Sequence, residues 1–163
     1  MQFTIEPVRK EDGKAIVDIF NHYVENSFAA YPEGRVPYEF FDLFLDTAQS
    51  YPFLVARDDE GDVLGFALLR PHESMSAFSG TAEITCFIAP QFTGRGVGKA
   101  MQERLLAEAR EKGINNILAG ISSLNSASLA FHRKQGFQEC GCFQRIGRKW
   151  GQDFDVVWMQ KMI

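Results

Sequence analysis

Three glycines at alternate positions, Gly94, Gly96 and Gly98, lie between an apolar stretch and an amphipathic one. Residues 81–89, before the glycines, predict a buried strand. After them, apolar residues recur at helical spacing over residues 101–112. A strand, a glycine-rich turn and a helix in succession are typical of α/β domains, in which helices cover the faces of a sheet.

The glycine-rich turn has the composition of an anion-binding loop. Glycine lets the backbone come close to a bound group and aim several N–H groups at it. The helix that follows contributes the partial positive charge of its N-terminus. Arg95 and Lys99 add full positive charges nearby. This stretch therefore predicts a site for a pyrophosphate.

Several interpretations of this loop compete. A P-loop has four residues between its first glycine and Gly-Lys, whereas three residues separate Gly94 from Gly98, and Ala100 replaces the metal-binding hydroxyl. The G-x-G-x-x-G dinucleotide fingerprint has a different spacing and follows the first strand of its domain. The pattern Gln91-x-x-Gly94-x-Gly96 fits the pyrophosphate loop of coenzyme A-dependent acetyltransferases. An ordinary glycine-rich turn is the remaining alternative.

The rest of the chain consists of further predicted strands and helices, with no repeat, low-complexity tract or linker. Strands are predicted at residues 3–8, 53–56, 63–69, 114–121, 137–146 and 154–162. Helices are predicted at residues 15–24, 38–49 and 126–135. We therefore expect one α/β domain that spans residues 1–163.

The composition argues against several classes of partner. With 45% hydrophobic residues in a chain of 163, there is enough apolar material for a packed core. The formal net charge of −4 argues against a protein that binds nucleic acid without sequence preference. No apolar run reaches the length of a membrane span. We therefore expect neither nucleic acid nor a membrane as a partner.

The three cysteines, Cys86, Cys140 and Cys142, contain no C-x-x-C pair, and their odd number argues against a disulfide framework. We interpret them as buried small residues and not as nucleophiles. The three histidines are scattered along the chain, so no metal site is expected. The first residues lack the basic and apolar regions of a signal peptide, which predicts a cytoplasmic protein.

Ordered motifs over nearly the whole chain resemble those of the GNAT-type N-acetyltransferase superfamily. Besides the glycine loop, they are Ile19–Ser27, Thr81–Glu83, Asn125–Leu129, His132–Phe137 and Gly147–Gly151, followed by Asp155 and Met159-Gln160. Within the superfamily, the chain is most similar to the phosphinothricin and methionine-sulfone acetyltransferase group. The resemblance implies a single GNAT-like α/β domain with a mixed, mostly antiparallel central sheet. Its parallel central strands are expected to splay apart, and helices to flank the sheet.

This resemblance also implies a reaction. An amine attacks the thioester of acetyl-CoA directly, without an acyl-enzyme intermediate, and acetyl-CoA is the co-substrate with no metal required. Because only a neutral amine attacks, a base must take its proton. Glu83 matches the glutamate that the family uses as this base. A salt bridge at the end of a strand is the alternative role for Glu83.

The same resemblance assigns the contacts with acetyl-CoA. Backbone N–H groups of residues 85–87 are expected to stabilise the oxyanion, and the amides of residues 94–99 to hold the pyrophosphate. The predicted cofactor-binding residues are Thr85, Cys86, Phe87, Thr93, Gly94, Arg95, Gly96, Val97, Gly98, Lys99, Asn125 and Ser128. Asn125 has a second explanation, because Asn before Ser-Ala-Ser is a good helix N-cap, and both roles can hold at once.

His132 stands where many superfamily members have a tyrosine that protonates the departing thiolate, and the phosphinothricin-like group has histidine there. A histidine near its ordinary pKa of about 6.5 can donate such a proton. The resemblance therefore implies His132 as the general acid. A histidine with a purely structural role is the alternative.

Two regions depart from the pattern of the group. Thr93 replaces an arginine or glutamine in the loop, although main-chain donors are still present there. Before Glu83, the residues His72, Met75 and Phe78 stand where the group tends to have tryptophan, arginine and tyrosine. A guanidinium at the Met75 position would bind an acidic group of the substrate, which a thioether cannot do.

The sequence consequently determines the acceptor site less well than the acetyl-CoA site. Phe28, Tyr31, Met75 and Phe78 are the predicted substrate residues. Arg70, Arg35 and Lys149 are candidates to replace the arginine that the chain lacks.

We predict an acetyl-CoA-dependent N-acetyltransferase that acts on the amine of a small amino acid or amino-acid analogue. A protein, peptide or polyamine N-acetyltransferase on the same fold is one alternative. A non-catalytic acyl-CoA-binding domain is another. The resemblance also suggests a homodimer, to which the apolar tail from residue 145 to residue 163 would contribute.

Overall fold

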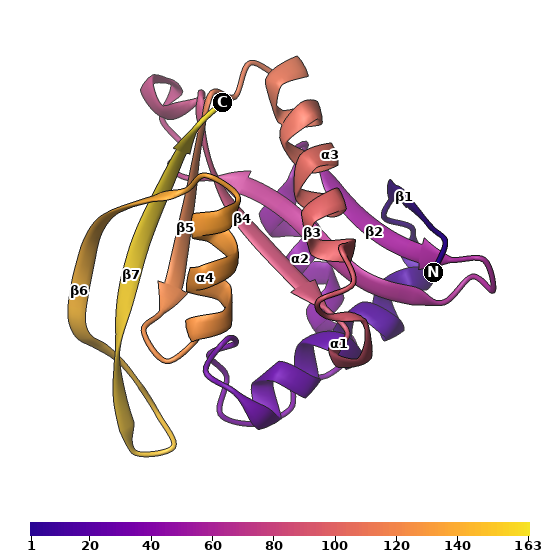
Figure 1. The fold of residues 1–163 in the computed structure, drawn as a ribbon, viewed down its shortest axis with the longest axis horizontal. Coiled ribbons are helices and arrows are strands. Elements are labelled where there is room, and N and C mark those ends of the chain that lie inside the picture. Colours follow the sequence, from indigo (N-terminus) through magenta and orange to yellow (C-terminus); the bar gives the residue numbers. More distant parts are fainter.

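The computed structural model describes residues 1–163, which form one seven-stranded sheet with helices on both faces (Figure 1). The strands lie in the order β1-β2-β3-β4-β5-β7-β6. Their bounds are β1 Phe3–Pro7, β2 Phe53–Asp58, β3 Val63–Pro71, β4 Thr81–Ile88, β5 Asn116–Ser122, β6 Gln138–Lys149 and β7 Gln152–Met162. All neighbours are antiparallel except β4 and β5, which are parallel, so the predicted mixed sheet is confirmed.

Two apolar clusters lie on opposite faces of the sheet. The helices are α1 Gly13–Asn26, α2 Phe40–Ala48, α3 Val97–Glu111 and α4 Ser126–Lys134, with short 3-10 segments at η1 Lys10–Asp12, η2 Ser76–Phe78 and η3 Pro90–Phe92. Helices α3 and α4 cover the face turned to the viewer in Figure 1, and α2 lies behind the sheet. Apolar residues of α3 and α4 belong to one buried cluster and those of α1 and α2 to the other. Each helix therefore buries an apolar face against its own side of the sheet.

The parallel strands β4 and β5 stay together only at their start. The pairing runs from Thr81 opposite Asn116 to Glu83 opposite Leu118, and then ends. Beyond this point β4 continues beside β3, and β5 continues beside β7. The two strands therefore diverge within the sheet, as the resemblance implied, and Figure 1 shows the gap widening below their paired ends.

The hairpin of β6 and β7 is longer than the sequence predicted. Strand β6 runs to Lys149 instead of residue 146, and β7 begins at Gln152 instead of residue 154. Trp150 and Gly151 form the connection, with φ values of 51° and 73°. Two successive residues in this left-handed region make the tight turn that matches the twist of a hairpin, so pairing continues up to the turn.

Two of the three cysteines are not buried, which corrects our interpretation of them. Cys140 and Cys142 are exposed on β6, and Cys86 on β4 is half-buried. The reason is that β6 is the edge strand of the sheet and nearly all of its residues are exposed. None of the helices is both long enough and apolar enough to cross a lipid bilayer.

Lys149 fastens the end of this hairpin to the segment that follows α1. Its side chain is fully buried. The ammonium Nζ donates hydrogen bonds to three backbone oxygens, those of Val24 at 2.6 Å, Ser27 at 2.7 Å and Ala30 at 2.7 Å. It also lies 4.2 Å from the centre of the Trp150 ring, where a cation–π interaction is favourable. Three acceptors match the three N–H groups of a charged lysine.

Replacing Lys149 by methionine should destabilise the protein by roughly 2–4 kcal/mol, because buried carbonyls would lose their donor. Urea unfolding of the variant and the wild type measures this difference in the free energy of unfolding. The matched control is Arg148→Ala, which removes an exposed ion pair with Asp153 and should cost less than about 1 kcal/mol. Equal effects of the two substitutions would contradict the structural role of Lys149.

Candidate active site

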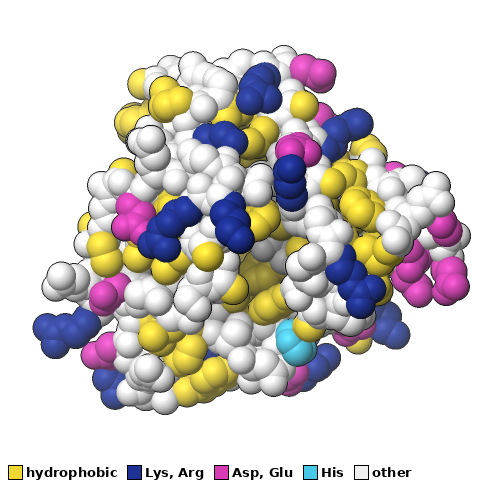
Figure 2. Space-filling model, in the orientation of Figure 1, with side chains coloured by type: hydrophobic (Ala, Val, Ile, Leu, Met, Phe, Trp, Pro, Cys, Tyr) yellow, Lys and Arg dark blue, Asp and Glu magenta, His cyan; other side chains and the backbone are white.

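A cavity of about 770 Å³ lies where β4 and β5 diverge. Its walls come from both strands, from the glycine loop, from α4 and from the aromatic side chains of α1 and α2. Figure 2 shows a hollow with an apolar floor near the middle of the face that carries α3 and α4. Lys and Arg side chains lie above it and to its right in this view. This arrangement suits a long ligand with an apolar part and an anionic part.

The glycine loop forms one end of the cavity. Gly94 and Gly96 have φ values of 72° and 86°, and a Cβ at either position would meet open space. Helix α3 begins directly after Gly96, so the amides of its first turn have no carbonyl partner within the helix. Lys99 lines the cavity at this end. The loop therefore offers free N–H groups, open space and positive charge, which together fit the pyrophosphate predicted here.

The open edge of β4 forms the middle of the cavity. The Ala89 amide donates to Leu64 on β3, whereas the carbonyls of Gly80 and Ile88 accept on the other side, from Asn116 and from the Tyr23 hydroxyl. Along a strand, the N–H and C=O groups of successive residues point alternately to its two sides. The even-numbered residues of β4 therefore direct their N–H and C=O groups toward the gap.

Of the three predicted oxyanion donors, Cys86 is therefore the one whose amide faces the gap. The amides of Thr85 and Phe87 lie on the β3 side, and their side chains line the cavity. Burial raises the pKa of the Cys86 thiol to about 12. A thiol with so high a pKa is protonated at neutral pH and is a poor nucleophile, in agreement with a role for the backbone of Cys86.

Glu83 lies where β4 and β5 part, and its carboxylate has two partners. Oε2 accepts a hydrogen bond from Arg70 Nε at 2.8 Å, and an Arg70 Nη lies 2.6 Å from the same oxygen in an ion pair. Oε1 lies 3.0 Å from Nδ1 of His72. The side chain lines the cavity and is only 14% exposed. The carboxylate is thus held in one orientation at the cavity wall, and the salt bridge that was the alternative role of Glu83 is present.

His132 is buried on α4 and lines the cavity. Its Nδ1 lies 2.9 Å from the backbone oxygen of Ser128, which can only accept, so Nδ1 carries a hydrogen and Nε2 is free in the neutral ring. Phe131 and Phe137 pack edge-on against the imidazole. Burial lowers the pKa of His132, and the hydrogen bond to Ser128 offsets this only in part. The neutral imidazole is consequently the favoured form at neutral pH.

Asn125 and Ser128 lie at the start of α4, and both line the cavity. The Asn125 side chain accepts a hydrogen bond of 3.2 Å from the Ser128 amide. Asn125 is therefore the N-cap of α4, as its position before Ser-Ala-Ser indicated. Its place at the cavity leaves room for a second role in ligand binding.

Thirteen of the eighteen predicted site residues line the cavity. They are Tyr31, Glu83, Thr85, Cys86, Phe87, Thr93, Gly94, Gly96, Gly98, Lys99, Asn125, Ser128 and His132. The structure places Arg95, Val97, Phe28, Met75 and Phe78 outside its lining.

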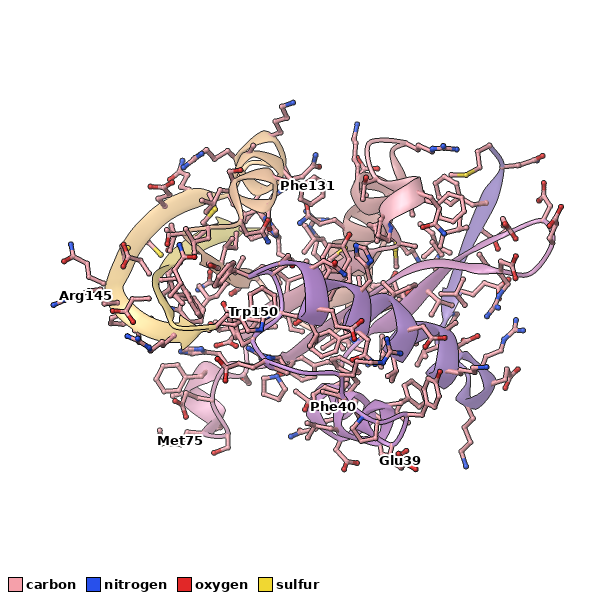
Figure 3. All side chains as sticks on the ribbon, turned by 90° about the horizontal axis from the view of Figure 1, so that it is seen from below. Glu39, Phe40, Met75, Phe131, Arg145 and Trp150 are labelled. Carbon is pink, nitrogen blue, oxygen red and sulfur yellow. The ribbon has the colours of Figure 1, made fainter.

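Each of these five has a different environment. The Arg95 guanidinium lies over the ring of Phe92, and the Val97 side chain is buried in the core. Phe28 packs edge-on against Trp150. Met75 is 61% exposed and lies beside η2 at the outside of the molecule in Figure 3. Phe78 is also exposed.

The aromatic wall contributed by the first two helices was not assigned to the site from the sequence. It includes Phe20 and Tyr23 of α1 and Phe40 and Phe44 of α2. Their helical spacing indicated only an apolar face, and an apolar face is the same pattern whether it meets the core or a ligand. The contact of His72 with Glu83 was also missed, because it depends on how β3 and β4 are aligned.

Comparison with known proteins agrees with this geometry. Residues 16–137 match the model of the Acetyltransferase (GNAT) family. An L-methionine sulfoximine/L-methionine sulfone acetyltransferase of Pseudomonas aeruginosa is 33% identical, over 98% of this chain and 94% of its own length.

Two solved structures have nearly the same fold. A phosphinothricin acetyltransferase from Sinorhizobium meliloti, in complex with AcCoA, has a TM-score of 0.92 and 28% identity, covering 100% of this chain and 89% of its own. A ribosomal-protein-alanine N-acetyltransferase from Brucella melitensis has a TM-score of 0.91 and 34% identity, covering 98% and 99%.

The fold and the cavity define an acyltransferase that takes its acyl group from a coenzyme A thioester. The chain belongs to the GNAT acetyltransferase family, as the family match and the relative at 33% identity show. It is an acetyl-CoA-dependent N-acetyltransferase with the single-sheet α/β fold that its sequence motifs predicted.

The lowered pKa of His132 predicts a pH dependence of stability. As the pH falls below about 6.5, the unfolded chain protonates this ring, while the folded chain resists the proton. The free energy of unfolding should therefore decrease as the pH is lowered from about 6.5 to the folded pKa. Urea unfolding between pH 7.5 and pH 5 measures this slope.

The slope should become smaller in His132→Asn, because the group that titrates is gone. The variant His22→Asn removes an exposed histidine and should keep the wild-type slope. A His132→Asn protein with an unchanged slope would contradict the burial of a neutral imidazole.

Proposed function

We propose that this protein transfers the acetyl group of acetyl-CoA to the amine of a small amino acid or amino-acid analogue. The observation that carries the proposal is the continuous cavity, which joins the glycine loop at one end to Glu83 at the other. The P. aeruginosa relative is named for L-methionine sulfoximine and L-methionine sulfone, and the S. meliloti structure for phosphinothricin. All three compounds are small amino-acid analogues.

Different residues of the chain bind acetyl-CoA and transfer protons in the proposed reaction. The amides at the start of α3 and the side chain of Lys99 hold the pyrophosphate. When bound, acetyl-CoA supplies a thioester carbonyl beside the open edge of β4. Glu83 accepts the proton of the incoming amine, directly or through a water molecule, so that the amine attacks in its neutral form. Arg70 and His72 keep the carboxylate at the cavity wall.

The backbone of Cys86 stabilises the charge that develops on the carbonyl oxygen, because its amide points into the gap between β4 and β5. We assign to His132, which lines the cavity, the delivery of a proton to the departing thiolate, the role that the resemblance implies. Because burial lowers its pKa, this proton is transferred readily once it is on the ring. The imidazole ring must first receive this proton from the solvent or from the substrate.

The alternatives differ in the acceptor that the site admits. The B. melitensis structure is named for a ribosomal protein, so a protein acceptor fits the same fold. Aromatic side chains of α1 and α2 line the cavity, and such an apolar wall suits a small acceptor better than an extended peptide backbone. A domain that only binds an acyl-CoA would need no base, whereas Glu83 is held at the cavity wall by two partners.

We further propose that residues 1–163 work as one catalytic domain, in the cytoplasm and as a homodimer. Three free cysteines suit a reducing compartment. The edge strand β6 presents Phe143 and Ile146 to solvent, 56% and 58% exposed. Apolar residues on an exposed sheet edge are a natural surface for a second copy of the chain.

Substitution of Glu83 tests the proposed chemistry. In Glu83→Gln, kcat for L-methionine sulfone or phosphinothricin should fall by roughly 10²–10⁴-fold, because the base is lost. The dissociation constant for acetyl-CoA should stay near the wild-type value, since the glycine loop is untouched. Thiol release measures the first quantity and calorimetry the second.

The matched control is Glu73→Gln, which changes an exposed glutamate in the same connection between β3 and β4. It should leave both quantities unchanged. Wild-type turnover confined to polyamines or peptides would overturn the proposed acceptor. Turnover of Glu83→Gln at the wild-type rate would overturn the role of Glu83.

A further inference from the structure

Arg70 and Glu83 form a pair of opposite charges at the inner end of the cavity. They lie directly opposite each other on β3 and β4, and both line the cavity. Residues at alternate positions share one face of a strand, so Leu68 and Thr85, the next cross-strand pair, line the cavity on the same face. The charged pair therefore continues the wall against which an acceptor would lie.

The other candidates for an acceptor-binding cation lie elsewhere. Arg35 binds Glu25 on the surface, and Lys149 is buried against three backbone carbonyls. Neither lines the cavity. Lys99 and Lys134 do line it, but they belong to the helices that follow the glycine loop and Asn125. Arg70 is the one arginine of the cavity wall, and it stands beside Glu83.

The guanidinium of Arg70 has unused hydrogen-bonding capacity. Arginine carries five N–H groups, and the contacts with Glu83 use Nε and one Nη, both directed at the same carboxylate oxygen. The Arg70 side chain is 43% exposed, against 14% for Glu83. Its positive charge also acts on Tyr31, because it offsets part of the rise that burial causes in the pKa of that phenol. The exposed part of the guanidinium is thus available to a second carboxylate, and both Arg70 and Tyr31 line the cavity.

The chemistry of an α-amino acid matches this pair. Its amine and its carboxylate are attached to one carbon atom, so the two groups need partners of opposite charge that lie side by side. We propose that Arg70 binds the carboxylate of an α-amino-acid acceptor and so places the amine at Glu83. This inference rests on the proposed function and names the specificity-determining residue of that site. It also explains how the chain recognises an acidic group although Met75 points to solvent.

The experiment compares two acceptors that differ only in the carboxylate, L-methionine sulfone and 3-(methylsulfonyl)propylamine. In Arg70→Gln, KM for the amino acid should rise roughly 10- to 100-fold, the range for a lost hydrogen bond to a charged group. KM for the amine should change little. Arg70→Lys keeps the positive charge but loses the parallel N–H groups with which a guanidinium binds a carboxylate. It should therefore give an intermediate KM for the amino acid. Arg35→Gln is the matched control and should change neither value.

A second measurement does not depend on turnover. The acid 4-(methylsulfonyl)butanoate lacks the amine, and it should inhibit the wild type in competition with L-methionine sulfone. Its inhibition constant should rise roughly 10- to 100-fold in Arg70→Gln. Acetyl-CoA binding and thermal unfolding of the variant report whether the fold is intact.

Three results would overturn the assignment. If Arg70 only positions Glu83, kcat falls by the same factor for both acceptors, and the inhibition constant does not change. If the wild type acetylates neither compound, the proposed function itself fails, which is seen before any variant is made. A wild type whose KM is the same for the amine and for the amino acid overturns the role of Arg70, while the transferase function stands.

Discussion

The separation of β4 and β5 is the constraint on which the rest of the structure depends. Backbone N–H and C=O groups inside a sheet normally bond to the neighbouring strand, and leaving them unpaired is costly. Here the pairing ends at Glu83, and each strand keeps a partner only on its outer side. The inner edges of β4 and β5 are therefore held apart and keep unpaired N–H and C=O groups. An extended ligand bound between the strands can form hydrogen bonds with these groups.

The cavity is assembled around this gap from parts distant in the sequence. The glycine loop and α3 follow β4, and α4 follows β5, so the two positively charged helix N-termini meet at the same end of the gap. On the other side, Lys149 ties the β6–β7 hairpin to the segment after α1, which carries Tyr31 into the cavity wall. The same buried ammonium thus links stability to the shape of the acceptor site.

Local patterns in the sequence predicted a large part of this architecture. The strand, glycine turn and helix around Gly96 follow from composition and periodicity over a short stretch. The family motifs placed Glu83, His132 and Asn125 on the elements where the structure has them. Local patterns do not determine how distant strands are aligned. The pairing of Arg70 with Glu83 depends on the register of β3 and β4, and a shift by one residue would turn Arg70 to the opposite face.

Strand order and side-chain direction, which local sequence patterns do not determine, also explain why some predicted residues lie elsewhere in the structure. Cys140 and Cys142 are exposed because β6 is an edge strand, and strand order is not a local property of the sequence. Met75 and Phe78 were named from their positions in a motif, but the η2 turn directs them away from the cavity. A position can be inferred from a resemblance, whereas the direction of a side chain depends on the backbone of this chain.

The most direct test of the central claim is an amide NMR titration of ¹⁵N-labelled protein with acetyl-CoA. The open edge of β4 and the start of α3 should bind the ligand through their backbone. The largest shifts are therefore predicted for the amides of Cys86, Gly96, Gly98 and Lys99. Saturation with acetyl-CoA that leaves these amides unmoved, with shifts confined to other parts of the sheet, would contradict binding through the open edge of β4.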